Sequence, residues 1–126
     1  MKPPRAESLD DVPGGPRFGS VLCLLSELPP RGSKAFQFRD GRLRYDIFVQ
    51  RWDDKVYAWR DACPHLKLPL DWRRGHFLDI EGRHIQCGHH GARFRIEDGY
   101  CIEGPCKGEY LTPIRIALRG DEILVG

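Results

Sequence analysis

The chain has 126 residues and a formal net charge of +2, with 20 basic residues nearly balanced by 18 acidic ones. This length supports one domain with a modest core. The balanced charge, with no basic stripe interleaved with aromatic residues, argues against a nucleic-acid partner. No apolar run approaches the roughly 20 residues that span a bilayer, and the start of the chain lacks the order of a secretory signal. The sequence therefore predicts a cytoplasmic protein without a membrane partner.

The first residues are rich in proline and glycine and poor in apolar anchors. This composition predicts a flexible N-terminal tail over residues 1–19, or an arm laid on the surface. The folded domain is expected to cover residues 20–126. Its first strand is expected at residues 19–24, where Cys23 would be a small buried hydrophobic residue.

The next segments alternate between apolar and polar residues and are separated by turns. Strands are expected at residues 34–38 and 43–50, on either side of the hairpin signal Asp40-Gly41. Phe48 falls out of phase with the alternation of its strand. After Asp53-Asp54, a strand at residues 56–59 leads directly to Cys63.

The second half of the chain continues the pattern of short strands and Gly/Asp turns. Strands are expected at residues 83–86 and 93–96, and two more at residues 114–118 and 123–125. Because no long segment has the 3.6-residue period of a helix, the sequence predicts an all-β fold. The core should include Trp52 and Trp59.

Two short segments each supply a cysteine and at least one histidine. They are Cys63-Pro64-His65 and Cys87-Gly88-His89-His90-Gly91, which together offer enough thiolates and imidazoles to close a metal site. Paired zinc ligands are usually separated by two to four residues, but one residue separates Cys63 from His65. In an extended segment this spacing places both side chains on one face, roughly 6–7 Å apart, which suits two adjacent metal ions better than one. A mononuclear zinc site is the alternative. His76 and His84 have no cysteine at ligand spacing, so they are expected to be surface or strand residues.

The Cys-x-His pair followed by Cys-x-x-His-Gly resembles the Rieske iron–sulfur motif. The resemblance implies a [2Fe–2S] cluster with Cys63 and Cys87 on the buried iron and His65 and His90 on the outer iron. The spacing favours His90 over His89, which would flank the cluster. An oxidised cluster with two thiolates and two neutral imidazoles has no net charge, so a partly apolar pocket can hold it.

The resemblance extends from about Val21 to the C-terminus. It implies a Rieske-type antiparallel β sandwich or barrel with a cluster-binding subdomain inserted at about residues 62–106. Gly104-Pro105 matches the proline-bearing loop that covers the cluster in this family.

The chain departs from respiratory Rieske proteins at several positions. Leu68 and His89 stand where those proteins have two further cysteines joined in a disulfide. Ala92 and Phe94 stand where they have a serine and a tyrosine that donate hydrogen bonds to cluster sulfurs. Because such hydrogen bonds stabilise the reduced cluster, their loss predicts a reduction potential near the bottom of the Rieske range.

Cys101 and Cys106 bracket the proline loop and leave two interpretations open. They form either a disulfide or thiol switch beside the cluster, or two small buried residues under the loop. Their spacing does not match a Cys-x-x-Cys redox motif.

The resemblance implies a small soluble ferredoxin that carries one electron at a time. It would be a monomer that passes electrons from a flavin reductase to a terminal oxygenase or a related oxidoreductase. The chain has neither a Rossmann fingerprint nor room for a non-heme iron domain, so an electron-transfer component is favoured over a complete enzyme. The alternatives are a small accessory subunit of an oxidoreductase such as nitrite reductase, a redox sensor, and a zinc-stabilised binding module.

Overall fold

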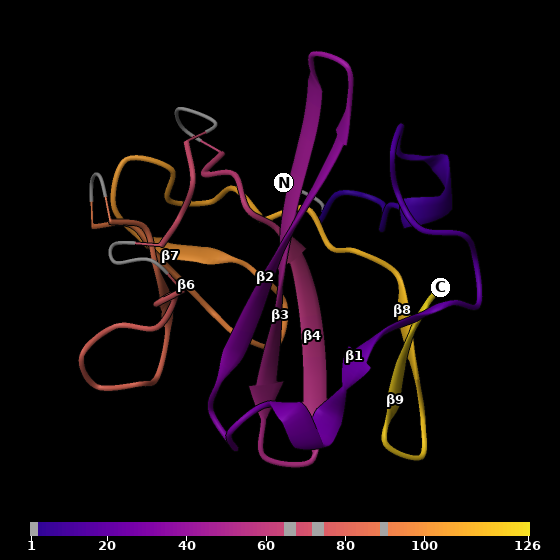
Figure 1. The fold of residues 1–126 in the computed structure, drawn as a ribbon. Coiled ribbons are helices and arrows are strands. Elements are labelled where there is room, and N and C mark those ends of the chain that lie inside the picture. The colour runs from indigo at the N-terminus through magenta and orange to yellow at the C-terminus, as the bar shows by residue number, and fades with distance from the viewer. Residues whose placement is uncertain (1–2, 65–67, 72–74, 89–90) are drawn as a thin grey trace.

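Three small antiparallel sheets make up the fold (Figure 1). The computed structural model describes residues 3–64, 68–71, 75–88 and 91–126. Within these ranges the regular elements are nine strands and two short 3-10 helices, η1 (Leu9–Asp11) and η2 (Leu25–Glu27). The all-β prediction is confirmed. In the same ranges, no helix has the length and apolar character needed to cross a membrane.

The largest sheet is a meander of three long strands: β2 (Ser33–Asp40), β3 (Leu43–Trp52) and β4 (Lys55–Arg60). The predicted hairpin between β2 and β3 is present, and Gly41 adopts a φ of 62° there. The next turn places Asp53 at a φ of 57°, a left-handed conformation that aspartate tolerates better than most residues. The strands predicted around these two turns are therefore confirmed.

A second sheet joins the two ends of the chain in the order β1 (Val21–Leu24), β9 (Glu122–Val125), β8 (Ile116–Arg119). The last two strands form the hairpin that the sequence predicts. The strand expected from residue 114 begins two residues later, at Ile116. Its apolar residues are less buried than alternation suggests, because Leu118 is 43% exposed.

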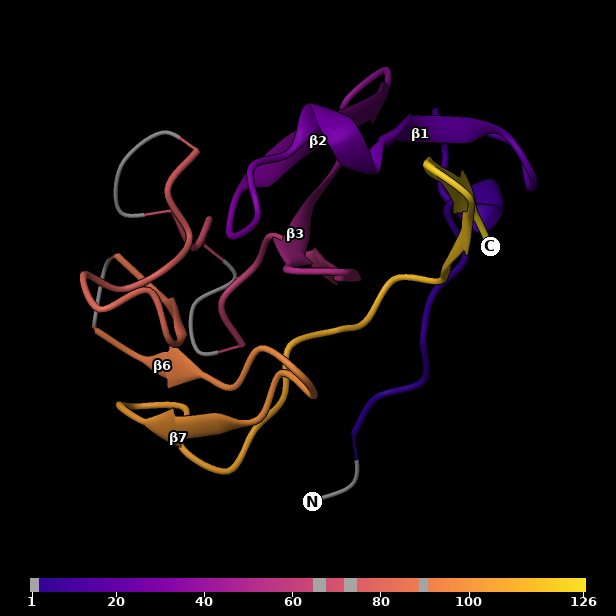
Figure 2. The same cartoon turned by 90° about the horizontal axis from the view of Figure 1, so that it is seen from below.

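The third sheet lies between β4 and β8 in the chain, in the segment that is called the insertion below. It consists of β5 (Ile85–Gln86), β6 (Arg93–Phe94) and β7 (Cys101–Glu103). Figures 1 and 2 show this sheet to one side of the β2–β4 meander, with the β1–β9–β8 sheet on the other. Strands β5 and β6 are shorter than the sequence predicts, and β7 lies in a segment for which no strand is predicted. Most of the described residues of this segment lie in loops. Backbone hydrogen bonds between loop residues, such as that from the Gly88 amide to the Leu70 carbonyl, hold these loops together.

Strand β3 contributes side chains to two hydrophobic cores. This explains why Phe48 falls out of phase with the alternation of the strand. Ile47 and Val49 lie in a core shared with β1 and β9, whereas Phe48 lies in a second core shared with the insertion. All three are fully buried. Successive side chains of a strand point to opposite faces, so Phe48 must point away from its two neighbours. Its ring stacks on that of Phe77, with 4.0 Å between centroids.

The N-terminal residues form an arm that packs on the domain. Leu9 is fully buried and Val12 is 8% exposed, and both belong to the core that contains Ile47. The Glu7 amide donates to the Pro113 carbonyl at 2.9 Å, and the Arg115 amide donates to the Glu7 carbonyl at 2.8 Å. The described part of this segment, residues 3–19, therefore lies against the domain as an arm, which is one of the two forms that its composition leaves open.

A buried carboxylate, Asp79, shapes the long excursion that separates the two cysteine segments. Its Oδ1 accepts the Arg83 amide at 3.0 Å and the His84 amide at 3.4 Å. Its Oδ2 lies 3.4 Å from His84 Nδ1 and 3.9 Å from Arg93 Nε. Burial alone would raise the pKa of Asp79, but these hydrogen bonds and His84 hold it below its usual value. His84 is therefore a half-buried partner of Asp79 and lies one residue before β5, whereas the sequence predicts a surface or strand residue.

Truncation of the side chain that links β3 to the insertion should destabilise the protein. We expect Phe48→Ala to lower the free energy of unfolding by about 3–5 kcal/mol, because it leaves a cavity against Phe77. Leu43→Ala, on the same strand but 59% exposed, should change it by about 0.5 kcal/mol or less. Urea unfolding followed by tryptophan fluorescence measures both. Equal losses in the two variants would contradict the second core.

The charge of Asp79 should stabilise the fold only above its unfolded pKa. We expect Asp79→Asn to lower the unfolding free energy at pH 7 by about 1–3 kcal/mol, because His84 and Arg93 then face a neutral amide. A depressed pKa contributes stability that is lost as the pH falls through the folded value, so the difference from wild type should shrink below roughly pH 4. Urea midpoints between pH 7 and pH 3 measure this, with exposed Glu81→Gln as the control. If the difference in unfolding free energy between wild type and Asp79→Asn did not change with pH, the charge of Asp79 would not be the source of the stabilisation.

Candidate metal centre

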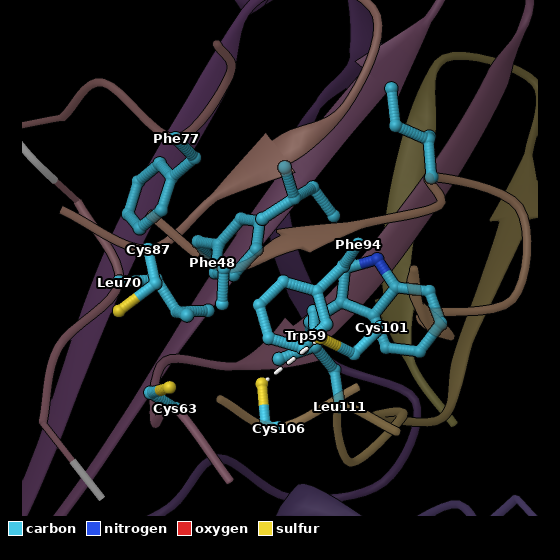
Figure 3. Packing of buried hydrophobic residues seen from close by; sticks show 13 residues of the cluster. Phe48, Trp59, Cys63, Leu70, Phe77, Cys87, Phe94, Cys101, Cys106 and Leu111 are labelled. Atoms are coloured by element: carbon cyan, nitrogen blue, oxygen red, sulfur yellow. Dashed lines mark hydrogen bonds between the residues drawn. The ribbon is translucent and has the colours of Figure 1, made fainter. Parts of the chain in front are cut away.

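The two predicted cysteine ligands lie in the same core. Cys63 and Cys87 are each 1% exposed and belong to the core cluster of the insertion (Figure 3). Cys63 follows β4, and Cys87 directly follows β5. The predicted ligands His65 and His90, and their neighbour His89, lie outside the described residues, so the structure describes only the two cysteines of the predicted ligand set.

Each cysteine opens a tight loop that its own backbone closes. The Cys63 amide donates to the Leu68 carbonyl at 2.8 Å, and the Cys87 amide donates to the Ala92 carbonyl at 2.8 Å. A further bond, from the Gly88 amide to the Leu70 carbonyl at 2.9 Å, joins the two loops. The chain therefore holds the two cysteine segments side by side, although 24 positions of sequence numbering separate Cys63 from Cys87.

Asp61 supports the first loop and was not identified from the sequence. Its Oδ1 accepts the Leu70 amide at 2.7 Å. Burial raises the pKa of Asp61 to about 6, although the Leu70 hydrogen bond lowers it; the carboxylates of Asp71 and Asp46 also raise it. In the sequence, Asp61 is recognisable only as an acidic residue two positions before Cys63. That position does not indicate which backbone amide its carboxylate binds.

The proline loop packs directly on the second cysteine loop. Gly104 adopts a φ of 103°, and a Cβ atom at this position would lie 2.7 Å from Ala92 Cα. Only glycine allows this approach without displacement of the backbone. Gly104 and Pro105 are exposed, whereas Cys106 beneath them is buried, so the loop covers one side of the core that contains Cys63 and Cys87.

Cys101 and Cys106 are buried thiols under this loop. Their exposed fractions are 0% and 2%, and their Sγ atoms lie 3.0 Å apart. None of the five cysteines, all within the described ranges, is in a disulfide. Burial raises the pKa of Cys106, and contacts with the thiols of Cys101 and Cys63 raise it further. Of the two interpretations left open by the sequence, the structure has the pair of buried thiols.

The cysteine half of the site fits an iron–sulfur cluster. Thiolates are soft ligands that favour iron–sulfur clusters or zinc, and here they are surrounded by Leu70, Phe77 and Phe94. Such a dry pocket accepts a group of little net charge, as an oxidised cluster with two thiolates would be. Among the described residues, no group of three or more Cys, His, Asp or Glu side chains is placed to hold a metal ion. The remaining ligands must come from elsewhere, and the predicted histidines lie outside the described residues.

Comparison with known proteins agrees with this geometry. The model of the Rieske [2Fe-2S] domain family matches residues 20–117. No curated protein matches the chain. Among solved structures, the ferredoxin of carbazole 1,9a-dioxygenase from Nocardioides aromaticivorans IC177 is similar, with 29% identity and a TM-score of 0.67. The match covers 86% of this chain and 97% of that ferredoxin.

A second ferredoxin and a complex have the same fold at lower identity. The Sphingomonas yanoikuyae B1 ferredoxin is 18% identical with a TM-score of 0.62, over 85% of this chain and 96% of the other. A chain from the complex of reduced oxygenase and oxidized ferredoxin in carbazole 1,9a-dioxygenase is 22% identical with a TM-score of 0.66, over 86% and 93%. With the family model matching most of its length and two buried cysteines at the motif positions, this chain belongs to the Rieske [2Fe-2S] domain family, and its cofactor is a [2Fe–2S] cluster.

Proposed function

We propose that this protein is a ferredoxin that carries one electron at a time from a flavin reductase to a terminal oxygenase. The observation that carries the proposal is the pair of buried cysteines on two joined loops within a Rieske domain. The match to nearly the full length of a carbazole dioxygenase ferredoxin supports a carrier over a domain of a larger oxygenase. The known complexes of such ferredoxins with their oxygenase support the choice of partner.

We propose Cys63, His65, Cys87 and His90 as the four cluster ligands, with residues 62–106 as the cluster-binding subdomain of a domain that spans residues 20–126. The cluster supplies the one-electron chemistry when it is bound. Cys63 and Cys87 would hold the cluster on its buried side. Leu70, Phe77 and Phe94 exclude water from this side. The loop that contains Pro105 covers the second cysteine loop through Gly104.

We further propose that the protein acts as a monomer in the cytoplasm. Its cysteines support this location, because a chain with five thiols and no disulfide suits a reducing compartment. The near balance of basic and acidic residues agrees with a protein partner rather than nucleic acid.

Spectroscopy of the purified protein tests the cofactor and its role together. We expect a red-brown protein whose dithionite-reduced form has a low-temperature EPR signal averaging below a g of about 2, as histidine-ligated two-iron clusters give. In stopped-flow measurements, the reduced protein should be reoxidised by the oxygenase component of a carbazole dioxygenase faster than by air alone. A colourless protein that contains zinc would instead indicate a binding module. A cluster that no oxygenase reoxidises would favour a redox sensor.

Substitution of the neighbouring histidines tests the ligand set. We expect His90→Ala to lose the cluster or its characteristic EPR signal, whereas His89→Ala, the matched control one residue earlier, should retain both. Cys63→Ala and Cys87→Ala should fail to assemble the cluster. The iron content per chain measures all four variants. If His89→Ala lost the cluster and His90→Ala retained it, His89 would be the ligand instead of His90.

The reduction potential should lie near the bottom of the Rieske range of roughly −150 to +300 mV. The reason is that the fully buried Ala92 and Phe94 have no hydroxyl group to donate to the cluster. We expect Ala92→Ser and Phe94→Tyr each to raise the potential by adding a donor. Phe36→Tyr adds a hydroxyl in the other core and should leave the potential unchanged. A wild-type potential well above zero would contradict the prediction.

A further inference from the structure

Strand β2 is an edge of its sheet, because β3 pairs with it on one side and no described strand pairs with it on the other (Figure 1). In an antiparallel ladder, hydrogen-bonded and non-bonded residue pairs alternate along the strands. The Arg51 amide donates to the Gly32 carbonyl at 2.9 Å, so these two residues form a bonded pair. The register therefore directs the backbone groups of the odd-numbered residues of β2, such as Ala35 and Gln37, away from β3.

Other parts of the chain close both ends of this edge. At one end, Ser33 Oγ donates to the Gly75 carbonyl at 3.2 Å. At the other end, Gly14 lies against β2, because a Cβ atom on Gly14 would be 2.1 Å from the Arg39 carbonyl oxygen. Between these ends, residues 35–37 make no backbone hydrogen bond to a described residue on the side away from β3. The open edge is therefore roughly 10 Å long.

A groove of about 520 Å³ runs along this open edge. Its volume lies within the range of roughly 300–1,000 Å³ that is usual for ligand sites. The described lining contains three carboxylates, which belong to Asp46, Asp61 and Asp71, and one basic residue, Arg44. Arg44 Nε lies 2.8 Å from Asp46 Oδ2, whereas Asp46 Oδ1 is buried and has no hydrogen-bond partner among the described residues. The excess of negative charge attracts a cation into the groove.

The two faces of β2 beside the groove differ in character. Gln37 lies opposite Asp46 in the register, so its side chain is on the face of the sheet that carries this carboxylate. Phe36 and Phe38 point to the other face, where their rings stack with 6.4 Å between centroids. A strand added at this edge would therefore fit best if a basic side chain, facing the carboxylates, alternated with apolar side chains beside the phenylalanines.

We propose that this groove is a docking site for a partner protein, which adds an extended segment to β2 as a further strand. The segment carries a lysine or arginine between apolar neighbours. Main-chain hydrogen bonds at Ala35 and Gln37 supply affinity, and the carboxylates select the basic side chain. The described lining of the groove includes none of the proposed cluster ligands, so the inference does not rest on the electron-transfer role.

A second copy of this chain fits the edge less well than another protein does. A two-fold antiparallel pairing centred on Gln37 would place Ala35 of each copy opposite Arg39 of the other. That pairing needs the Arg39 carbonyl as an acceptor, but Gly14 covers this oxygen. The observed arm therefore favours a short foreign segment over a dimer.

Binding of the blocked peptide acetyl-Thr-Val-Arg-Val-Thr-amide to the cluster-containing protein tests the proposal. Isothermal titration calorimetry should show saturable binding that weakens as the salt concentration rises. The same peptide with glutamate in place of arginine should bind at least about tenfold more weakly, because it brings a like charge to the carboxylates. A version N-methylated at its three central residues lacks the main-chain donors and should lose binding to a similar extent.

A proline in β2 tests the added strand from the side of the protein. Gln37→Pro removes an amide hydrogen that points away from β3, a position at which edge strands tolerate proline. It should raise the Kd of the peptide about tenfold. Leu118→Pro is the matched control on β8, also an edge strand, and should leave the Kd unchanged. The bond from the Gly126 amide to the Arg115 carbonyl, with the register of β8, places the Leu118 amide on the outer side as well.

A neutral substitution in the groove tests the charge. Asp71→Asn keeps an acceptor for the Gly75 amide, which lies 3.2 Å from Asp71 Oδ2. It should raise the Kd about twofold to fivefold. Asp54→Asn, in the exposed turn between β3 and β4, should not change it. If Gln37→Pro does not fold, Asp71→Asn and the peptide variants still decide the outcome.

The possible outcomes separate this inference from its alternatives. Absence of peptide binding, or equal effects of the groove variants and their controls, would overturn the docking site. Dimerisation in analytical ultracentrifugation that Gln37→Pro abolishes would assign the edge to a second copy instead. A protein that binds the peptide but that no oxygenase reoxidises contradicts only the proposed function.

Discussion

The burial of β3 on both faces is the constraint on which the rest of the structure depends. Ile47 and Val49 anchor one core and Phe48 anchors the other. A slip of one residue in the pairing with β2 or β4 would exchange these faces and place each side chain in the wrong core. The insertion therefore cannot be a loosely attached lobe. The strand that organises the meander also forms one wall of the core around Cys63 and Cys87.

The site combines soft ligands with a dry environment. The backbone amides of Cys63 and Cys87 are satisfied by the Leu68 and Ala92 carbonyls, so neither cysteine leaves its own amide unpaired in this core. The surrounding side chains are leucine and phenylalanine. An isolated charge would be costly in this environment, whereas a group that alternates between neutral and singly negative is tolerated.

Much of the fold could be predicted from local patterns. The Asp40-Gly41 hairpin and the strand that leads to Cys63 follow from alternation and turn chemistry, and the spacing of the two cysteine segments led to the Rieske family. The burial of Leu9 could not be predicted, because the core that it joins combines residues from distant parts of the chain, such as Ile47 and Ile123. The roles of Asp61 and Asp79 likewise depend on which amides the loops bring to their carboxylates. Such contacts leave no periodic trace in a sequence.

The pairing of Val21 with Leu124 has a consequence for the newly made chain. During synthesis β1 emerges well before its partner β9, because the whole of the meander and the third sheet lie between them in the chain. Until then, β1 presents an unpaired edge with Val21 and Leu24, a kind of segment that can pair with other chains. The meander of β2, β3 and β4 needs only neighbours in sequence and can form in the meantime. Closure of this sheet therefore waits until β9 has been synthesised.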